Sequence, residues 1–176
     1  FTTSTLQQDA NSRLGFSAKA TMSAAQKLYQ DGKITYMRTD SVNLSDQALG
    51  QMTSFIKSKY GEEYHQFRTF QTKNSSAQEA HEAIRPTDVK IEKASEDSYN
   101  QKLYNLIRNR TLASQMAPAK LEKTTATIKI STSKEVFEAK GEVIIFDGFL
   151  KVYGASKKDP EILPEIELGD KLSCQT

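Results

Sequence analysis

The hydrophobic pattern of this 176-residue chain changes its period at Pro118, and this change constrains the fold more than any other feature. Before Pro118, apolar residues recur at every third or fourth position, as on one face of an α-helix. After it, segments rich in Thr and Ile alternate polar and apolar residues, which is typical of half-buried strands. The pattern therefore predicts an α+β fold, with helices first and an antiparallel β segment after them.

Capping residues and glycines indicate where the helices begin and end. The first helix is expected to be capped by Thr3 or Ser4 and to stop at Gly15, and the second runs from Ser17 to Gly32, with Leu28 or Tyr29 on its buried face. Ser45 opens a third helix that ends before Gly61. Ser76 and Glu79 form an S-x-x-E capping box for a short helix that Pro86 ends, and Ser95 caps the longest helix, roughly 96–116, with Tyr99 expected on its buried stripe.

Three to five antiparallel strands are expected in the last third of the chain. The candidates are 124–131, 135–140, 143–146, 149–153 and 171–174, with Asp147-Gly148 as a turn signal. A sheet of this size makes a thin core by itself. We therefore expect the β segment to pack against other parts of a longer polypeptide.

Charge divides the chain in the same way. Residues 1–121 carry 16 basic and 12 acidic side chains, a net charge of +4, whereas residues 122–176 carry 8 and 10, a net charge of −2. Such small excesses are also common on ordinary solvated surfaces. Together with the change of period, they predict two domains, a helical one over 1–121 and a partial β domain over 122–176.

Several classes of protein are disfavoured by composition. One cysteine, Cys174, cannot form an internal disulfide, and two histidines are too few for a structural zinc site. Low cysteine content fits a reducing, intracellular compartment. No apolar stretch has the length of a membrane span, so no membrane partner is expected. The chain begins with Phe1 rather than Met, and we expect it to be a piece of a longer protein.

The densest polar cluster is Ile34-Thr35-Tyr36-Met37-Arg38-Thr39-Asp40-Ser41, between two predicted helices. Tyrosine can act as a covalent nucleophile. Residues 33–37 are expected to be extended, and on an extended backbone Tyr36 and Arg38 project from the same side. The guanidinium could then contact a phosphate that the phenol attacks. By spacing alone, a structural tyrosine beside a surface arginine is the more common interpretation.

A second cluster is Glu79-Ala80-His81-Glu82-Ala83-Ile84-Arg85-Pro86-Thr87. On a short helix, His81 and Arg85 would share one face because they are four residues apart. Histidine can donate to a phosphate or move a proton near neutral pH. By spacing alone, a capped surface helix with intrahelical pairs is again the more common interpretation.

These clusters resemble the signatures of type IA DNA topoisomerases. Residues 32–41 resemble the active-site signature of that family, and residues 80–87 its second signature. Residues 1–7, 113–119 and 146–149 match further segments in the same order. Within the family, Met37, Glu82 and Arg85 favour the bacterial topoisomerase I branch over the topoisomerase III branch. The topoisomerase part of a reverse gyrase is an alternative, since it has a similar core.

The resemblance implies a reaction and two catalytic residues. Type IA topoisomerases relax negatively supercoiled DNA by transient single-strand cleavage through a 5′-phosphotyrosine, followed by strand passage. Tyr36 matches the nucleophile of that family, and Arg38 matches the residue that steadies the scissile phosphate. Because the phosphotyrosine bond retains the energy of the phosphodiester, religation would need no ATP.

The remaining site residues are expected to support these two. His81 and Arg85 match contacts to DNA or to the hydrogen-bond network of the active site. Thr39 and Asp40 are expected to orient the reacting groups, and Asp40 could hold Arg38 in place. All six residues are on the helical part of the chain.

The resemblance also implies what the chain would need from elsewhere. The family uses Mg²⁺ bound by an acidic Toprim domain, and no such acidic cluster is visible here, so no metal ligand is expected in this chain. The expected partners are a single-stranded segment of DNA and the Toprim and remaining arch domains of the same polypeptide, in the cytoplasm at the bacterial nucleoid. The chain alone is expected to be inactive. A non-catalytic helical module that binds DNA, or a pure interaction domain, would be the competing hypotheses.

Overall fold

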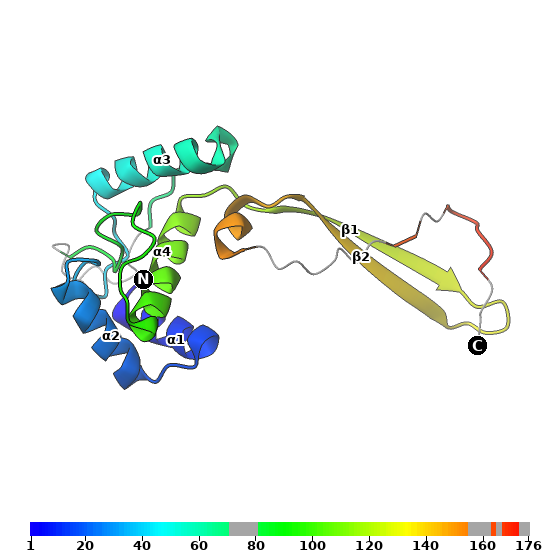
Figure 1. Cartoon of the computed structure of the whole chain (residues 1–176). Helices are drawn as coiled ribbons and strands as arrows, with labels where there is room; N and C mark the ends of the chain where they lie inside the picture. The colour runs from blue at the N-terminus through cyan, green and yellow to red at the C-terminus, as the bar shows by residue number, and fades with distance from the viewer. Residues whose placement is uncertain (71–80, 155–162, 165–166, 173–176) are drawn as a thin grey trace. The chain divides into compact units, whose positions relative to one another are not determined.

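The computed structural model describes residues 1–70, 81–154, 163–164 and 167–172. It divides the chain into two compact units, Phe1–Ala117 and Pro118–Thr176. Helices make up the first unit and a β-hairpin the second (Figure 1). The α+β class predicted from the change of period is therefore confirmed. The division lies at Pro118 itself, a few residues before the boundary at 121 expected from charge.

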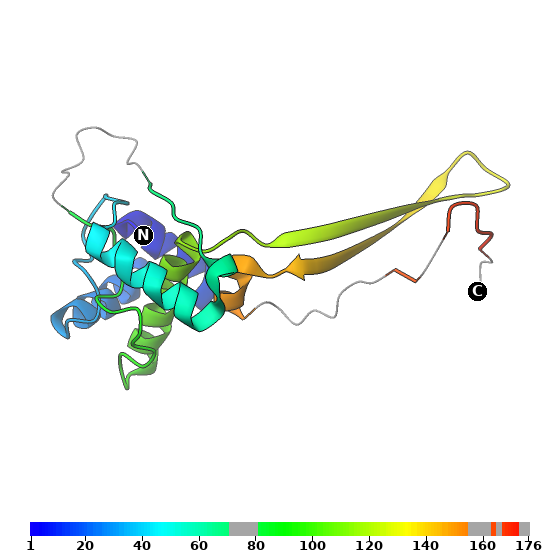
Figure 2. The same cartoon turned by 90° about the horizontal axis from the view of Figure 1, so that it is seen from above.

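Four α-helices and a short 3-10 helix form the described part of the first unit. They are α1 (Thr3–Leu14), α2 (Ala18–Gln30), α3 (Asp46–Tyr60), η1 (Glu62–Tyr64) and α4 (Ser98–Ser114). Helices α1, α2 and α4 pack against one another, as Figures 1 and 2 show from two directions. Their shared core consists mostly of small and aliphatic side chains, with Leu6, Ala25, Leu28, Leu103 and Ile107 almost fully buried, and it also includes Phe16 and Tyr104.

Polar side chains cap the helices at or near the predicted positions. Ser17 and Ser45 cap α2 and α3 as expected, each accepting a hydrogen bond from a backbone N–H in the first turn. For α1 the cap is Thr2, just before the two predicted candidates Thr3 and Ser4. For α4 the cap is Asp97 instead of Ser95, because the Asp97 carboxylate accepts from the backbone N–H of Asn100 at 2.9 Å.

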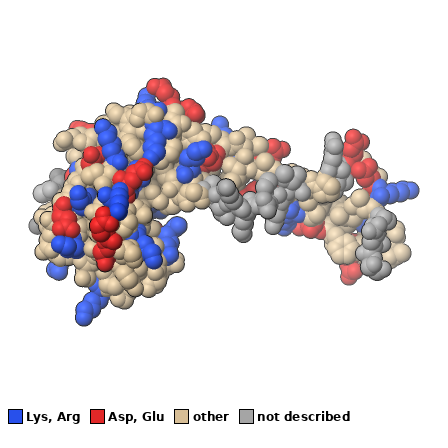
Figure 3. Space-filling view, viewed as in Figure 1, with Lys and Arg blue, Asp and Glu red and all other residues tan. Residues whose placement is uncertain are grey.

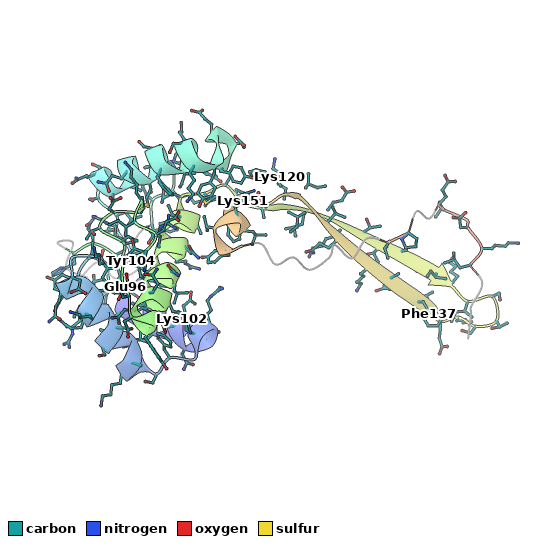
Figure 4. The ribbon with its side chains drawn as sticks, in the orientation of Figure 1. Glu96, Lys102, Tyr104, Lys120, Phe137 and Lys151 are labelled. Atoms are coloured by element: carbon teal, nitrogen blue, oxygen red, sulfur yellow. The ribbon has the colours of Figure 1, made fainter. Side chains whose placement is uncertain are left out.

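Of the aromatic residues considered for buried faces, Tyr29 and Tyr99 are both exposed, and only for Tyr99 does this overturn a prediction. Tyr29 is 41% exposed on α2, where Leu28 takes the buried position. Tyr99 is 59% exposed at the start of α4, where its ring stacks on Phe16 with centroids 4.9 Å apart. The core of α4 is built further along the helix, around Leu103 and Tyr104. Figure 4 labels Tyr104 on this helix.

The second unit contains one antiparallel hairpin of β1 (Lys120–Lys129) and β2 (Val136–Phe146). The prediction of three to five strands is wrong for the described residues. Segments 135–140 and 143–146 form one continuous strand, because Gly141 pairs with Thr124 without interrupting the ladder. The segment after the Asp147-Gly148 turn is a 3-10 helix, η2 (Gly148–Tyr153). Nζ of Lys151 in this helix pairs with Oδ2 of Asp147 at 3.3 Å.

The hairpin leaves large apolar side chains on its surface. Phe137, labelled in Figure 4, is 65% exposed near the turn. Ile145 is 62% exposed at the other end of β2. Residues 171–172 show no regular structure, and the rest of the strand expected at 171–174 lies outside the described residues. Within the described chain, no helix combines the length and apolar character needed to cross a bilayer.

Candidate active site

The segment that carries Tyr36 connects α2 to α3 and is anchored at its start by the end of α2. Gly32 adopts a φ of 68°, a conformation that favours glycine and turns the chain away from the helix. The backbone N–H of Lys33 then donates to the carbonyl of Leu28 at 2.8 Å. Residues 33–37 are not a regular strand, although Ile34 forms an isolated antiparallel bridge with Pro86.

The two clusters singled out in the sequence meet in space. The backbone N–H of Thr35 donates to the carbonyl of Arg85 at 2.9 Å, and the Thr35 hydroxyl donates to the carbonyl of Ala83 at 2.7 Å. Two residues along, the backbone N–H of Thr87 donates to the carbonyl of Lys33 at 3.0 Å. These bonds join segments about fifty residues apart and place His81 and Arg85 beside the tyrosine segment.

Burial alternates along the residues that follow. Tyr36 is 42% exposed and Arg38 is exposed as well, whereas Met37 and Thr39 are only 2% and 9% exposed. This alternation is what the prediction of one shared side for Tyr36 and Arg38 requires, and both side chains reach solvent. The buried residues between them hold the segment in place, so the two polar side chains are displayed on an anchored backbone.

Thr3 at the start of α1 supplies much of that anchoring. Its hydroxyl donates to the carbonyl of Met37 at 2.9 Å and accepts from the backbone N–H of Thr39 at 2.9 Å. Its backbone N–H donates to the carbonyl of Thr39, also at 2.9 Å. The backbone on both sides of Arg38 is thus bonded to the first turn of a helix, which limits its movement.

Residues 81–85 are not helical, which corrects the prediction that His81 and Arg85 share a helix face. The predicted capping residues Ser76 and Glu79 lie outside the described residues. The backbone N–H groups of Ala83 and Ile84 donate to the carbonyls of Asn43 and Phe1, both at 2.8 Å. Because these N–H groups bond to distant segments, they are not available for the hydrogen bonds of a helix.

His81 and Arg85 consequently have different surroundings. His81 is exposed, and its ring lies 6.5 Å from the ring of Tyr36. The Arg85 side chain is only 14% exposed, and its Nη2 pairs with Oε2 of Glu82 at 2.6 Å while its Nη1 donates to the carbonyl of Pro86 at 3.0 Å. His81 is therefore accessible to a ligand, whereas Arg85 is largely committed to the internal network.

Thr39 and Asp40 also differ from each other. Thr39 is buried, and its hydroxyl accepts from the backbone N–H of Ser41 at 3.0 Å. Asp40 is exposed, and among the described residues no ion pair joins it to Arg38. Thr39 thus shapes the backbone that carries Arg38, while the expected support of Arg38 by Asp40 is not formed in this structure.

Two residues of the site were missed in the sequence. The ring of Tyr29 lies 5.3 Å from the ring of Tyr36 in an edge-to-face arrangement at 67°. Glu82 holds Arg85 and also accepts a hydrogen bond from the backbone N–H of Ser45, the cap of α3, at 2.7 Å. Helical periodicity left Leu28 and Tyr29 as equal candidates for burial, and no local pattern relates Glu82 to Ser45.

The pKa of Glu82 reflects this position. Burial raises the pKa, but hydrogen bonds from Arg85 and Ser45 lower it by more, so the pKa lies below the usual value of 4.5. The charged carboxylate therefore stabilises the folded state. It links the segment of His81 and Arg85 to the start of α3.

Glu82→Gln should lower the free energy of unfolding by about 1–3 kcal/mol at about pH 7, because Arg85 and Ser45 lose a charged acceptor. The pKa of Glu82 is lower in the folded state than in the unfolded chain. The stabilisation is therefore fully present at pH values above the usual pKa of 4.5 and is lost as the pH falls through the folded pKa. Urea unfolding of the wild type and of Glu82→Gln at about pH 7 and about pH 3 tests this. The difference between their free energies of unfolding should be smaller at the lower pH. An equal difference at the two pH values would contradict a role for the charge.

Charged side chains and metal-ligating side chains do not gather at one place among the described residues of the helical unit (Figure 3). Figure 3 shows basic and acidic side chains interspersed over the viewed face of the helical unit. Among the described residues, no three His, Cys, Asp or Glu side chains converge as a metal site would require. The site thus offers an exposed phenol, an exposed guanidinium and an exposed imidazole, groups that suit contact with a phosphate.

Comparison with known proteins identifies the family. The profile of a family described as DNA topoisomerase matches residues 1–176. The chain is 47% identical to DNA topoisomerase 1 type prokaryotic of Acanthamoeba polyphaga mimivirus, over 92% of this chain and 20% of that protein. It is 43% identical to DNA topoisomerase 1 of Synechocystis sp., over 99% of this chain and 21% of that protein.

A solved structure agrees with the sequence relatives. Full-length topoisomerase I from Thermotoga maritima matches with a TM-score of 0.78 and 39% identity, over 97% of this chain and 29% of that chain. The chain spans about a fifth of the length of the curated relatives named above. Profile, sequence and fold together show that the chain belongs to the DNA topoisomerase family, in the bacterial type IA topoisomerase I branch.

Proposed function

We propose that the chain carries the DNA-cleaving tyrosine of a topoisomerase that relaxes negatively supercoiled DNA through a transient single-strand break. One observation carries the proposal. Tyr36 and Arg38 are both exposed on a segment whose intervening residue, Met37, is 2% exposed and whose backbone is bonded to Thr3. A nucleophile and a phosphate-binding cation are thereby presented together, as phosphoryl transfer requires.

Tyr36 would attack the phosphorus of a DNA phosphodiester. The new bond joins the phenol oxygen to the 5′ phosphate, the bond from phosphorus to the 3′ oxygen breaks, and the proton lost by the phenol is balanced by the one gained by the 3′ hydroxyl. The reverse attack by that hydroxyl restores both groups, so no external energy source is consumed. Arg38 would offset the negative charge that builds on the phosphate oxygens in either direction.

The other residues of the site would act around this pair. His81 is accessible beside Tyr36 and would contact DNA or take part in proton movement. Arg85 would act through Glu82 and the backbone of the site instead of directly on DNA. Thr39 would hold the backbone next to Arg38, and Asp40, being exposed, would influence the electrostatic potential around the phosphate.

Further parts of the full-length protein would complete the enzyme. Mg²⁺ would be held by a Toprim domain elsewhere in the polypeptide, as the resemblance to the family implies. Remaining arch segments would cover apolar side chains of the hairpin such as Phe137 and Ile145, which are exposed here. The substrate would be a single-stranded segment of chromosomal DNA in the bacterial cytoplasm.

Mapping the covalent bond tests the proposal directly. The full-length protein is incubated with a single-stranded oligonucleotide and Mg²⁺, denatured, and digested with protease and nuclease. Mass spectrometry should then find the nucleotide on the peptide that contains Tyr36. A nucleotide attached to any other residue would contradict the proposed role, and the neighbouring Tyr29 is an internal control for that outcome.

A further inference from the structure

Tyr29 is the side chain of the site for which neither the reaction nor the core provides a role. It lies on the last turn of α2, and its ring meets the ring of Tyr36 at 5.3 Å and 67°. Edge-to-face pairs of aromatic rings are favourable and have a defined geometry. With 41% of Tyr29 and 42% of Tyr36 exposed, this contact lies at the surface of the site and not in the core.

The backbone under Tyr29 is firmly held. Leu28, the preceding residue, is 1% exposed in the core shared by α1, α2 and α4. The carbonyl of Tyr29 accepts from the backbone N–H of Gly32 at 2.9 Å, and the carbonyl of Gly32 accepts from the hydroxyl of Thr87 at 2.7 Å. The turn between the two tyrosines is therefore bonded at both ends, and the backbone that carries Tyr29 is held in place.

An exposed tyrosine without such a support would sample several rotamers, and a nucleophile that is misplaced by about 1 Å reacts up to about 100-fold more slowly. We propose that Tyr29 is a positioning residue for Tyr36, which limits the phenol to one orientation through contact between the rings. This inference rests on the proposed function, because it assigns to Tyr29 the alignment of the nucleophile. It predicts that the ring of Tyr29 is needed and that its hydroxyl is not.

Three variants of the full-length protein separate these contributions. Tyr29→Phe keeps the ring, Tyr29→Leu removes it, and Tyr99→Leu is the matched control. Tyr99 is likewise an exposed tyrosine in a ring contact, but its partner is the core residue Phe16, which is not part of the site. The rate of adduct formation at saturating protein is measured with a 3′-labelled single-stranded oligonucleotide and Mg²⁺. The dissociation constant is measured separately by fluorescence anisotropy without Mg²⁺.

Tyr29→Leu should slow adduct formation by about 10-fold to 100-fold, with the dissociation constant changed by less than about twofold. Tyr29→Phe and Tyr99→Leu should both remain within about twofold of the wild type in rate. Rescue by the conservative variant distinguishes ring contact from a role of the hydroxyl. Because Tyr29 is partly exposed, neither substitution should unfold the protein, and equal melting temperatures of the two variants would verify this. If Tyr29→Leu is less stable, Tyr29→Phe still tests the role of the hydroxyl.

Other outcomes would overturn the inference. An unchanged rate for Tyr29→Leu would show that the ring contact does not position the nucleophile. If Tyr29→Leu has a larger dissociation constant for DNA but an unchanged rate of adduct formation at saturating protein, Tyr29 is a base-stacking residue instead. A loss in Tyr29→Phe as large as in Tyr29→Leu would assign the effect to the hydroxyl. In each case adduct formation by the wild type at Tyr36 would leave the proposed function intact, whereas an adduct at another residue would refute that function independently.

Discussion

Tyr36→Phe is expected to abolish the covalent complex between protein and DNA, because the variant lacks the phenol oxygen that would form the bond to phosphorus. The substitution is conservative in every other respect. The phenylalanine ring can keep the contacts with Tyr29 at 5.3 Å and His81 at 6.5 Å. Loss of the adduct would therefore report on the oxygen alone.

The label on the oligonucleotide makes this experiment sharper. A tyrosine bound to the 5′ phosphate retains the downstream part of the strand, so a 3′ label should migrate with the denatured protein and a 5′ label should be released. Tyr36→Phe should give neither signal and should bind DNA with the wild-type dependence on salt, because phosphate contacts determine that dependence. If the variant still forms the adduct, Tyr36 is not the nucleophile. If the wild type binds DNA but forms no adduct with Mg²⁺ present, the chain belongs to a non-catalytic binding module.

Arg38→Ala is expected to slow strand cleavage by about 100-fold to 1000-fold, the usual effect of removing a donor that stabilises charge in the transition state. Arg38 is exposed and lies two residues from Tyr36, on a segment whose buried residues Met37 and Thr39 fix its position. Arg38→Lys should recover part of the rate, because the ammonium keeps the charge but lacks the planar fork of donors that matches a phosphate. Single-turnover rates of adduct formation at saturating protein provide the measurement.

Arg13→Ala is the control for this prediction. Arg13 is also an exposed arginine, but it lies on the last turn of α1 and is paired with Asp9 at 3.7 Å. Its removal should leave the cleavage rate unchanged. A saturated rate that stays the same in Arg38→Ala while the dissociation constant increases would limit Arg38 to DNA binding and exclude it from the transition state.

Much of the helical unit could be predicted from the sequence, because its signals are local. Ser17 and Ser45 cap their helices through hydrogen bonds to N–H groups three residues away, and Gly15 ends α1 with a φ of 70° that favours glycine. The β segment was harder to predict. A glycine such as Gly141 reads as a break between two strands, yet its partner Thr124 keeps the ladder continuous. Pairing between strands is decided by a neighbour that local patterns do not identify.

The site shows the same division between local and distant information. The sequence by itself was sufficient to single out Tyr36 and Arg38, because residues 32–41 resemble the active-site signature of the family. The separation of two residues predicted only that the two side chains share one side of an extended segment. Only the tertiary structure decided that His81 and Arg85 leave the predicted helix, since the backbone N–H groups of Ala83 and Ile84 bond to residues distant in sequence. It likewise placed Tyr29 against Tyr36 and Glu82 against Ser45. These contacts depend on how the turn after α2 and the segment at 81–87 come together, and periodicity along the chain contains no information about that packing.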